Sequence, residues 1–277
     1  MDPTTIVSLR RTPGGLGVCA LALLLAAAVP SRAQAQGGSA SAMDGQWHFT
    51  VAPYFWMTGI KGDVSVASLP SVPIDASFSD IMKSFDIGLQ GRFEARKDRV
   101  GLSLDFMYTN LGAPVASSAP IVGALGMKAD VRQLITEGTV FYRVATGGRA
   151  DNPAHLDLLV GARYTGTKTR LTAQSPAGVD YNTEDQKISW VDALAGVKFR
   201  APLGSRAAFL GRADVAGFGS NVTWNLEGDL GFRAADHWWL GAGYRFMDID
   251  YESSDGDVPR KLDVAYAGPR VWFAYAW

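Results

Sequence analysis

Residues capable of acid, base or nucleophilic chemistry are sparse in this 277-residue chain. The chain has three histidines, His48, His155 and His237, and one cysteine, Cys19. Hydrolases usually pair a histidine base with a serine nucleophile or a carboxylate. All three histidines fall at one end of the alternating segments described below, and none joins a serine or paired aspartates at the other end. We therefore expect interfacial polar residues, no catalytic site and no cofactor.

One acidic cluster carries potential ligand chemistry. Asp248, Asp250, Asp255 and Asp257 lie close together in the sequence, and carboxylates suit hard divalent cations such as those that bridge lipopolysaccharide. A solvated acidic loop explains the same residues with fewer assumptions. We expect no resident metal here.

Most of the other charged residues recur at alternate positions, with both signs mixed. Burying so many charges in a soluble core would be costly unless every one were paired. We predict that they line a charge-paired interior that is closed or only weakly conducting, with at most a slight anion preference. Arg212 and Glu227 are the predicted partner pair on neighbouring strands. The predicted inward residues are Arg92, Glu94, Arg96, Asp105, Arg132, Glu137, Arg143, Asp157, Arg163, Asp192, Lys198, Arg200, Arg212, Asp214, Glu227, Asp229, Arg233, Arg245 and Arg270.

The elements that position these charges alternate with a period of two. From Val100 to Leu111 the apolar residues occupy one face and the polar residues the other, over a length typical of a tilted membrane strand. The pattern predicts ten strands, near 46–60, 85–97, 100–112, 129–146, 154–168, 187–201, 206–218, 221–234, 237–251 and 261–277.

The connections between these strands alternate between short and longer ones. This alternation is typical of outer-membrane barrels, and an even strand number returns both termini to the periplasmic side. The fold class we predict is therefore all-β, a closed antiparallel up-and-down transmembrane barrel, with eight or twelve strands as alternatives. Lysine and arginine number 26 against 27 acidic residues, a balance that excludes a nucleic-acid binder.

The first 35 residues form a separate segment. Arg10 and Arg11 precede the apolar run Cys19–Val29, and Ala33-Gln34-Ala35 resembles a cleavage site. This pattern predicts a signal peptide over 1–35 and a barrel over 36–277. Cleavage would remove Cys19, so we expect neither disulfides nor thiol-bound metal in the mature chain.

Aromatic residues are predicted to form two girdles, with Tyr108 and Tyr164 in the outer one.

At the C-terminus, Val271, Phe273, Tyr275 and Trp277 occupy every second position. This strand resembles the signature by which bacterial outer-membrane barrels are recognised for assembly. With Pro53-Tyr54-Phe55-Trp56, Phe78-Ser79-Asp80-Ile81 and Gly91–Arg96, it resembles a largely uncharacterised family of Gram-negative outer-membrane proteins. The resemblance covers nearly all of 46–277 and implies no catalytic residues.

The longest connection, 61–84, is predicted to hold a short helix capped by Ser77 or Ser79. We expect a packed loop with a helical turn, and a lid or plug over the mouth of the barrel is the alternative. The leading functional prediction is a non-enzymatic outer-membrane protein, either structural or a narrow small-solute channel. A membrane-embedded hydrolase acting on lipid or peptide is the alternative, and a surface adhesin is the third. Expected partners are outer-membrane lipid, lipopolysaccharide and the barrel-assembly machinery.

Overall fold

The computed structural model describes residues 44–65, 72–79, 85–115, 126–149, 152–174, 180–253 and 260–277. The predicted signal peptide, residues 1–35, lies outside the described residues. The strands are β1 (Trp47–Trp56), β2 (Gly59–Ser65), β3 (Val72–Ala76), β4 (Phe85–Lys97), β5 (Val100–Val115), β6 (Gly126–Arg149), β7 (Asn152–Gln174), β8 (Asp180–Pro202), β9 (Ala207–Gly217), β10 (Val222–Arg233), β11 (Trp238–Ser253) and β12 (Arg260–Ala276).

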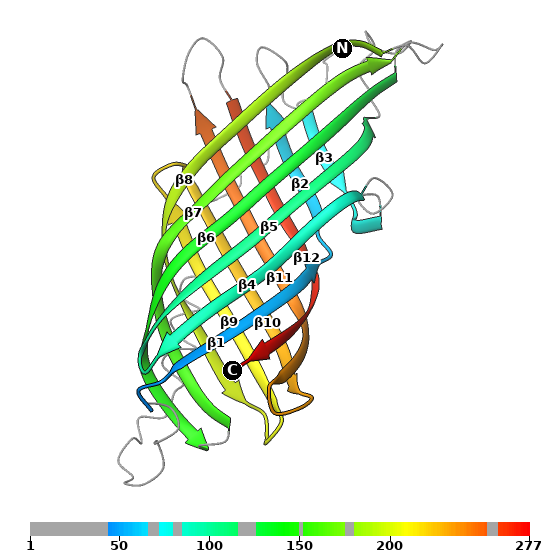
Figure 1. The fold of residues 1–277 in the computed structure, drawn as a ribbon. Coiled ribbons are helices and arrows are strands. Elements are labelled where there is room, and N and C mark those ends of the chain that lie inside the picture. The colour runs from blue at the N-terminus through cyan, green and yellow to red at the C-terminus, as the bar shows by residue number, and fades with distance from the viewer. Residues whose placement is uncertain are drawn as a thin grey trace, which may run out of the picture. The chain divides into compact units, whose positions relative to one another are not determined.

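Ten of these strands form a closed ring. β1 pairs with β4 on one side and with β12 on the other, and β4 to β12 follow one another in chain order (Figure 1). Every pairing in the ring is antiparallel. The predicted all-β, ten-stranded closed barrel is confirmed. Closure leaves no unpaired sheet edge in the ring, which only a barrel achieves.

The first predicted strand divides into two. The pairing of β1 with β4 ends at Pro53, and at the end of β1 the backbone N–H of Trp56 donates to the side-chain Oε1 of Gln90 at 2.9 Å. β2 then continues along β12, and β3 folds back on β2 as a hairpin. The described part of the connection 61–84 therefore extends the wall, so the alternative of a lid or plug is wrong for this part.

A helical turn at Phe78 and Ser79 follows β3, as the sequence predicted for this stretch. Its Phe78 ring meets the ring of Phe55 edge-on, with 6.4 Å between centroids. Because Phe55 belongs to the outward face of β1, the turn packs on the outside of the wall rather than over the lumen.

Apolar side chains cover the outside of the barrel and charged side chains fill the inside. Leu104, Val160 and Leu230 are about 60% exposed on the outer wall, at 59%, 60% and 60%. Arg163 and Arg245 are 0% and 1% exposed in the interior. This distribution is the reverse of a soluble protein. Within the described residues, no helix is long and apolar enough to cross a membrane.

Candidate functional site

The lumen holds the charged residues that the alternation assigned to it. Strand alternation turns all sixteen of the following residues inward: Arg92, Glu94, Arg96, Asp105, Glu137, Arg143, Asp157, Arg163, Asp192, Lys198, Arg212, Asp214, Glu227, Asp229, Arg245 and Arg270. They sit in the middle of the barrel and toward the end where β1 begins and β12 ends, which is the end that holds the termini of the described barrel. Charges buried this deeply require close partners.

Two glutamates form the centre of this network. Glu137 on β6 accepts from Arg163 Nε at 2.7 Å and from Arg212 Nη2 at 2.6 Å. Glu227 on β10 pairs with Arg92 at 3.0 Å and with Arg270 at 2.9 Å. Each glutamate is 2–3% exposed. Both carboxylates therefore hold arginines from several strands at once.

Three aspartates around the two glutamates complete the charge balance of the network. Arg92 Nε donates to Asp105 at 2.7 Å, and the Tyr54 hydroxyl donates to the same carboxylate at 2.8 Å. Arg163 also donates to Asp214, and Arg270 to Asp229. Five arginines thus meet five carboxylates: Arg92, Arg163, Arg212, Arg245 and Arg270 with Asp105, Glu137, Asp214, Glu227 and Asp229. The central network is neutral as a whole.

Side chains from opposite walls meet across the lumen. Arg245 on β11 lies 3.7 Å from Glu137 on β6, five strands away around the ring. Toward the termini, Lys198 Nζ on β8 donates to Glu94 on β4 at 2.7 Å and lies 3.4 Å from the centre of the Phe141 ring. These contacts cross the interior at two levels.

Toward the other end, apolar residues replace the charges. Trp190 and Tyr251 stack with their ring centroids 4.2 Å apart, and Gln133 Nε2 donates to the Tyr266 hydroxyl at 2.7 Å. Trp190, Tyr251 and Tyr266 belong to a cluster of buried inward residues. The cluster consists of Trp56, Met107, Ile135, Ile188, Trp190, Met247, Ile249, Tyr251, Leu262, Val264 and Tyr266. The alternation did not predict this layer. Its residues occupy the same alternating positions as the inward charges, and those positions were expected to be polar.

Two details of the predicted lumen are wrong, and one inward residue is held by other partners than the rest. Arg212 and Glu227 stand opposite each other in register but form their ion pairs elsewhere, Arg212 with Glu137 and Glu227 with Arg92 and Arg270. Asp192 lies inward as predicted and, among the described residues, accepts from Trp190 Nε1 and from the backbone N–H groups of Gly219 and Ser220. Arg132 is exposed on the outward face, because its neighbour Gln133 points inward.

The histidines and aspartates are placed without catalytic partners among the described residues. The Asp44 carboxylate accepts from the backbone N–H of Gln46 at 2.9 Å and lies 3.0 Å from His48 Nε2, and these two contacts, the first the larger, lower the pKa of Asp44. His237 Nδ1 lies 2.7 Å from the carbonyl oxygen of Ala276, and His155 lies 3.8 Å from Asp157.

Asp248 and Asp250 lie on the outward face of β11, and Asp250 accepts from Asn221 at 3.1 Å. Asp255 and Asp257 lie outside the described residues. Within the described residues, no group of three or more acidic, histidine or cysteine side chains could hold a metal.

The C-terminal strand closes the barrel. Phe273, Tyr275 and Trp277 face outward, with Phe273 and Trp277 exposed by 47% and 49%. Trp277 exchanges two backbone hydrogen bonds with Phe49, at 2.8 and 3.0 Å, and their rings stack at 5.6 Å. The last residue therefore pairs directly with the first strand.

Fold and surface together define a β-barrel with an apolar outer wall and a packed, charge-neutral interior. No family model and no curated protein matches the chain. Among solved structures, the translocator domain of autotransporter NalP from Neisseria meningitidis matches with 13% identity over 94% of this chain and 96% of that one, at a TM-score of 0.39.

Two further structures match at similar levels. The Ralstonia pickettii toluene transporter TbuX has 13% identity over 85% of this chain and 90% of that one, with a TM-score of 0.36. The attachment invasion locus protein Ail of Yersinia pestis has 9% identity over 83% and 98%, with a TM-score of 0.33. These low scores carry no conclusion about function, and the barrel is established by the strand pairing itself.

Proposed function

We propose that this protein is an integral outer-membrane barrel with a closed interior, which serves the envelope as a structural protein and not as an open pore. The observation that carries this proposal is the contact across the lumen between non-adjacent strands at three depths. Arg245 meets Glu137 in the middle, Lys198 meets Glu94 toward the termini, and Trp190 stacks on Tyr251 at the other end. Open aqueous channels belong to barrels of about 16 strands, whereas small barrels fill their interior with side chains.

The outer wall supports this membrane location. A large exposed apolar surface is stable only against lipid or a partner, and a closed barrel is one of two folds that satisfy every backbone group inside a bilayer. The turns at the end that holds the termini are short, as between Lys97 and Val100. Short turns are periplasmic in such barrels, so we place both termini in the periplasm.

Ion conductance in a planar bilayer tests the closed interior. The wild-type barrel should give no large, stable or strongly ion-selective currents. A variant with Arg245→Gly, Lys198→Gly and Trp190→Gly removes the contact at all three depths and should conduct, which shows that the assay detects an opening. Large selective currents from the wild type would instead make the protein a channel.

We also propose that the protein is not an enzyme. The placement of His48, His155 and His237 supports this, because each contacts a carboxylate or backbone oxygen near the end that holds the termini. The folded barrel should release no fatty acid from phospholipid or lipopolysaccharide above background. Release that is lost on replacing one histidine would favour the membrane-embedded hydrolase.

A further inference from the structure

Three cations form a row on the outer wall, and the charged lumen does not include them. Arg132 on β6, Lys168 on β7 and Lys187 on β8 are direct register neighbours on three adjacent strands. All three occupy outward positions, since Gln133 and Ile188 beside them are buried in the interior. Like charges directly opposite each other in a sheet destabilise it. We call these three residues the basic row.

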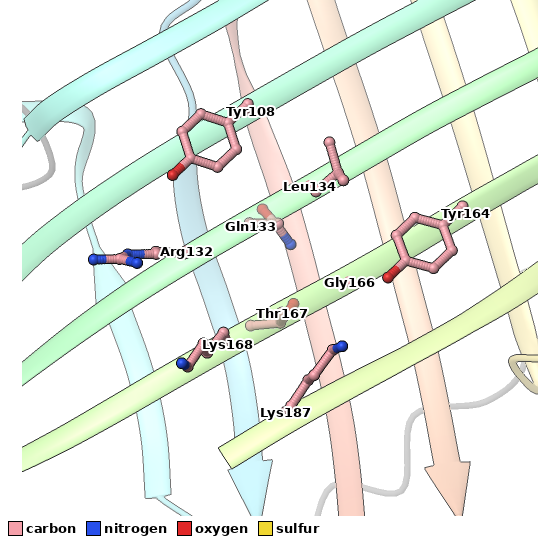
Figure 2. Close-up of a pocket in the computed structure, with 9 residues that line it drawn as sticks. All are labelled: Tyr108, Arg132, Gln133, Leu134, Tyr164, Gly166, Thr167, Lys168 and Lys187. Carbon is pink, nitrogen blue, oxygen red and sulfur yellow. The ribbon is translucent and has the colours of Figure 1, made fainter. Parts of the chain in front are cut away.

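The basic row borders a hollow in the wall. The hollow has a volume of about 150 Å³ and is lined by the basic row together with Tyr108, Leu134 and Tyr164. Figure 2 shows the two tyrosine hydroxyls pointing toward the same strand ends as Arg132 and Lys168, while Lys187 points back toward Tyr164. The hollow thus has an aromatic and apolar side toward the middle of the barrel and a cationic side toward the strand ends.

Gly166 gives the hollow its shape. A Cβ atom at this position would lie 2.8 Å from the Tyr164 hydroxyl oxygen and 3.1 Å from a carbon of its ring. Tyr164 can therefore lie along its own strand only because residue 166 has no side chain. Gly166 keeps the Tyr164 hydroxyl beside the basic row.

The basic row marks the upper border of the apolar wall. On the side toward the middle of the barrel, the same strands expose Val140, Val160 and Val191 by 47%, 60% and 57%. On the other side, two residues further along the register, the backbone of Arg170 pairs with Asp130 on one strand and Asp185 on the other, so the residue types in that row alternate in sign. The excess positive charge is confined to the level where an apolar belt meets water.

The opposite side of the barrel has the reverse charge at its outer end. There Asp250 and Asp263 are register neighbours on β11 and β12. A membrane lipid with an anionic headgroup would therefore be attracted to the β6–β8 side and repelled from the β11–β12 side. Its acyl chains would lie along the exposed apolar residues below the basic row.

We propose that the basic row and its hollow bind a phosphate of lipid A, the membrane anchor of lipopolysaccharide, in the outer leaflet. Arginine and lysine donate charge-assisted hydrogen bonds to phosphate oxygens, and tyrosine hydroxyls at a membrane interface bond polar headgroup atoms. Lipid A combines phosphates, sugar hydroxyls and acyl chains, which match the cationic, tyrosine and apolar parts of this surface. The inference rests on the outer-membrane orientation proposed above.

The experiment measures lipid retention by the folded barrel in mild detergent, by native mass spectrometry. The probes are bisphosphorylated lipid A, dephosphorylated lipid A and phosphatidylglycerol, in the presence of a chelator so that divalent cations do not bridge the contact. The wild type should prefer bisphosphorylated lipid A over both other probes. Raised salt should weaken this preference, because exposed charges are screened.

The test variant carries Arg132→Gln, Lys168→Gln and Lys187→Gln. Its control carries Lys97→Gln, Arg206→Gln and Lys261→Gln, which removes the same charge from exposed sites away from the hollow. The test variant should bind lipid A at least about tenfold more weakly, since basic residues near a membrane surface each add to the attraction. The control should bind like the wild type.

A second variant, Gly166→Leu, keeps every charge but fills the hollow and displaces Tyr164. It should lose the preference for lipid A over phosphatidylglycerol. Unchanged lipid A binding by the triple variant, or equal binding of dephosphorylated lipid A or phosphatidylglycerol by the wild type, would overturn the proposal. Heat-dependent migration in SDS, recorded for every variant, separates these outcomes from a failure of the barrel itself.

Discussion

At the scale of single residues, a charged side chain in this barrel has two sets of neighbours, those beside it in the sheet and those across the lumen. Glu227 shows which set prevails. Its register neighbour Arg212 stands directly opposite, yet Glu227 bonds Arg92 from β4 and Arg270 from β12. In a narrow ring, long arginine side chains reach partners across the interior as easily as those on adjacent strands.

This arrangement predicts unequal coupling energies. Glu227→Gln should lower the free energy of unfolding by about 3–5 kcal/mol, because it leaves buried arginines without a counter-charge. In double-mutant cycles, Glu227 should couple to Arg92 by about 1–3 kcal/mol, more than it couples to Arg212. Urea-induced unfolding in phospholipid vesicles, followed by tryptophan fluorescence, measures both.

Glu252→Gln serves as the control for this prediction, because Glu252 is exposed at the end of β11. Its effect should stay within about 0.5 kcal/mol. A coupling of Glu227 to Arg212 that equals or exceeds its coupling to Arg92 would contradict the observed pairing and restore the adjacent-strand pair.

The sequence predicts which face of a strand a side chain occupies better than it predicts the residue with which that side chain pairs. A period of two is enough to turn Arg163 and Glu137 inward, since one backbone parity decides the face of every residue on a strand. It cannot say that Glu137 meets Arg245 from the opposite wall, because this depends on strand tilt and shear. The error at Arg132 in the basic row has a simpler reason. Arg132 is five residues from Glu137, and this odd spacing places the two side chains on opposite faces, so the inward prediction for Arg132 conflicts with that for Glu137.

At the scale of strands, the alternating pattern predicts the ten strands of the ring and their order well, but it predicts the length of several strands poorly. β4 spans Phe85–Lys97, as predicted, whereas β8 begins at Asp180 and not near residue 187. The residues that extend β8 beyond the prediction, 180–186, include polar residues at both alternating positions of the sequence, so the alternation fades there while the backbone ladder with β7 continues. β3 was missed because five residues, Val72–Ala76, are too few to show a period.

The last strand is both a wall element and the predicted assembly signal, and the two roles can be separated. Phe273 and Leu240 are register neighbours on β12 and β11, and they are 47% and 52% exposed on the outer wall. Phe273→Asp and Leu240→Asp therefore place the same charge at the same depth in lipid. Their cost to refolding in vesicles should be similar and at most a few kcal/mol.

In cells the two variants should differ. Phe273→Asp, like Tyr275→Asp or deletion of Trp277, should lower the amount of folded barrel in the outer membrane well below that of Leu240→Asp. Membrane fractionation with unheated SDS gels measures this. Equal cellular levels of the two matched variants would show that only the lipid-facing cost matters and that the C-terminal strand carries no recognition signal.

At the scale of the whole molecule, stability depends on closure. The ring has no free edge, its interior network is neutral, and its outer wall is already suited to lipid or detergent. A detergent that coats the outside gains little access to the backbone ladder while the ring is shut. Unfolding therefore requires many strand pairs to separate together.

This cooperative closure predicts the behaviour of the protein in SDS. The purified barrel should keep its fold in cold SDS and migrate differently after boiling, when the ring opens. It should also stay with the membrane after a high-salt wash that removes peripheral proteins.

A chain that ends at residue 259 lacks β12, which pairs with β1, β2 and β11, and its barrel therefore cannot close. This truncated chain should migrate identically before and after boiling. Recovery of the full chain in the soluble periplasmic fraction without detergent would contradict the membrane location, because an exposed apolar belt of this extent is not stable in water.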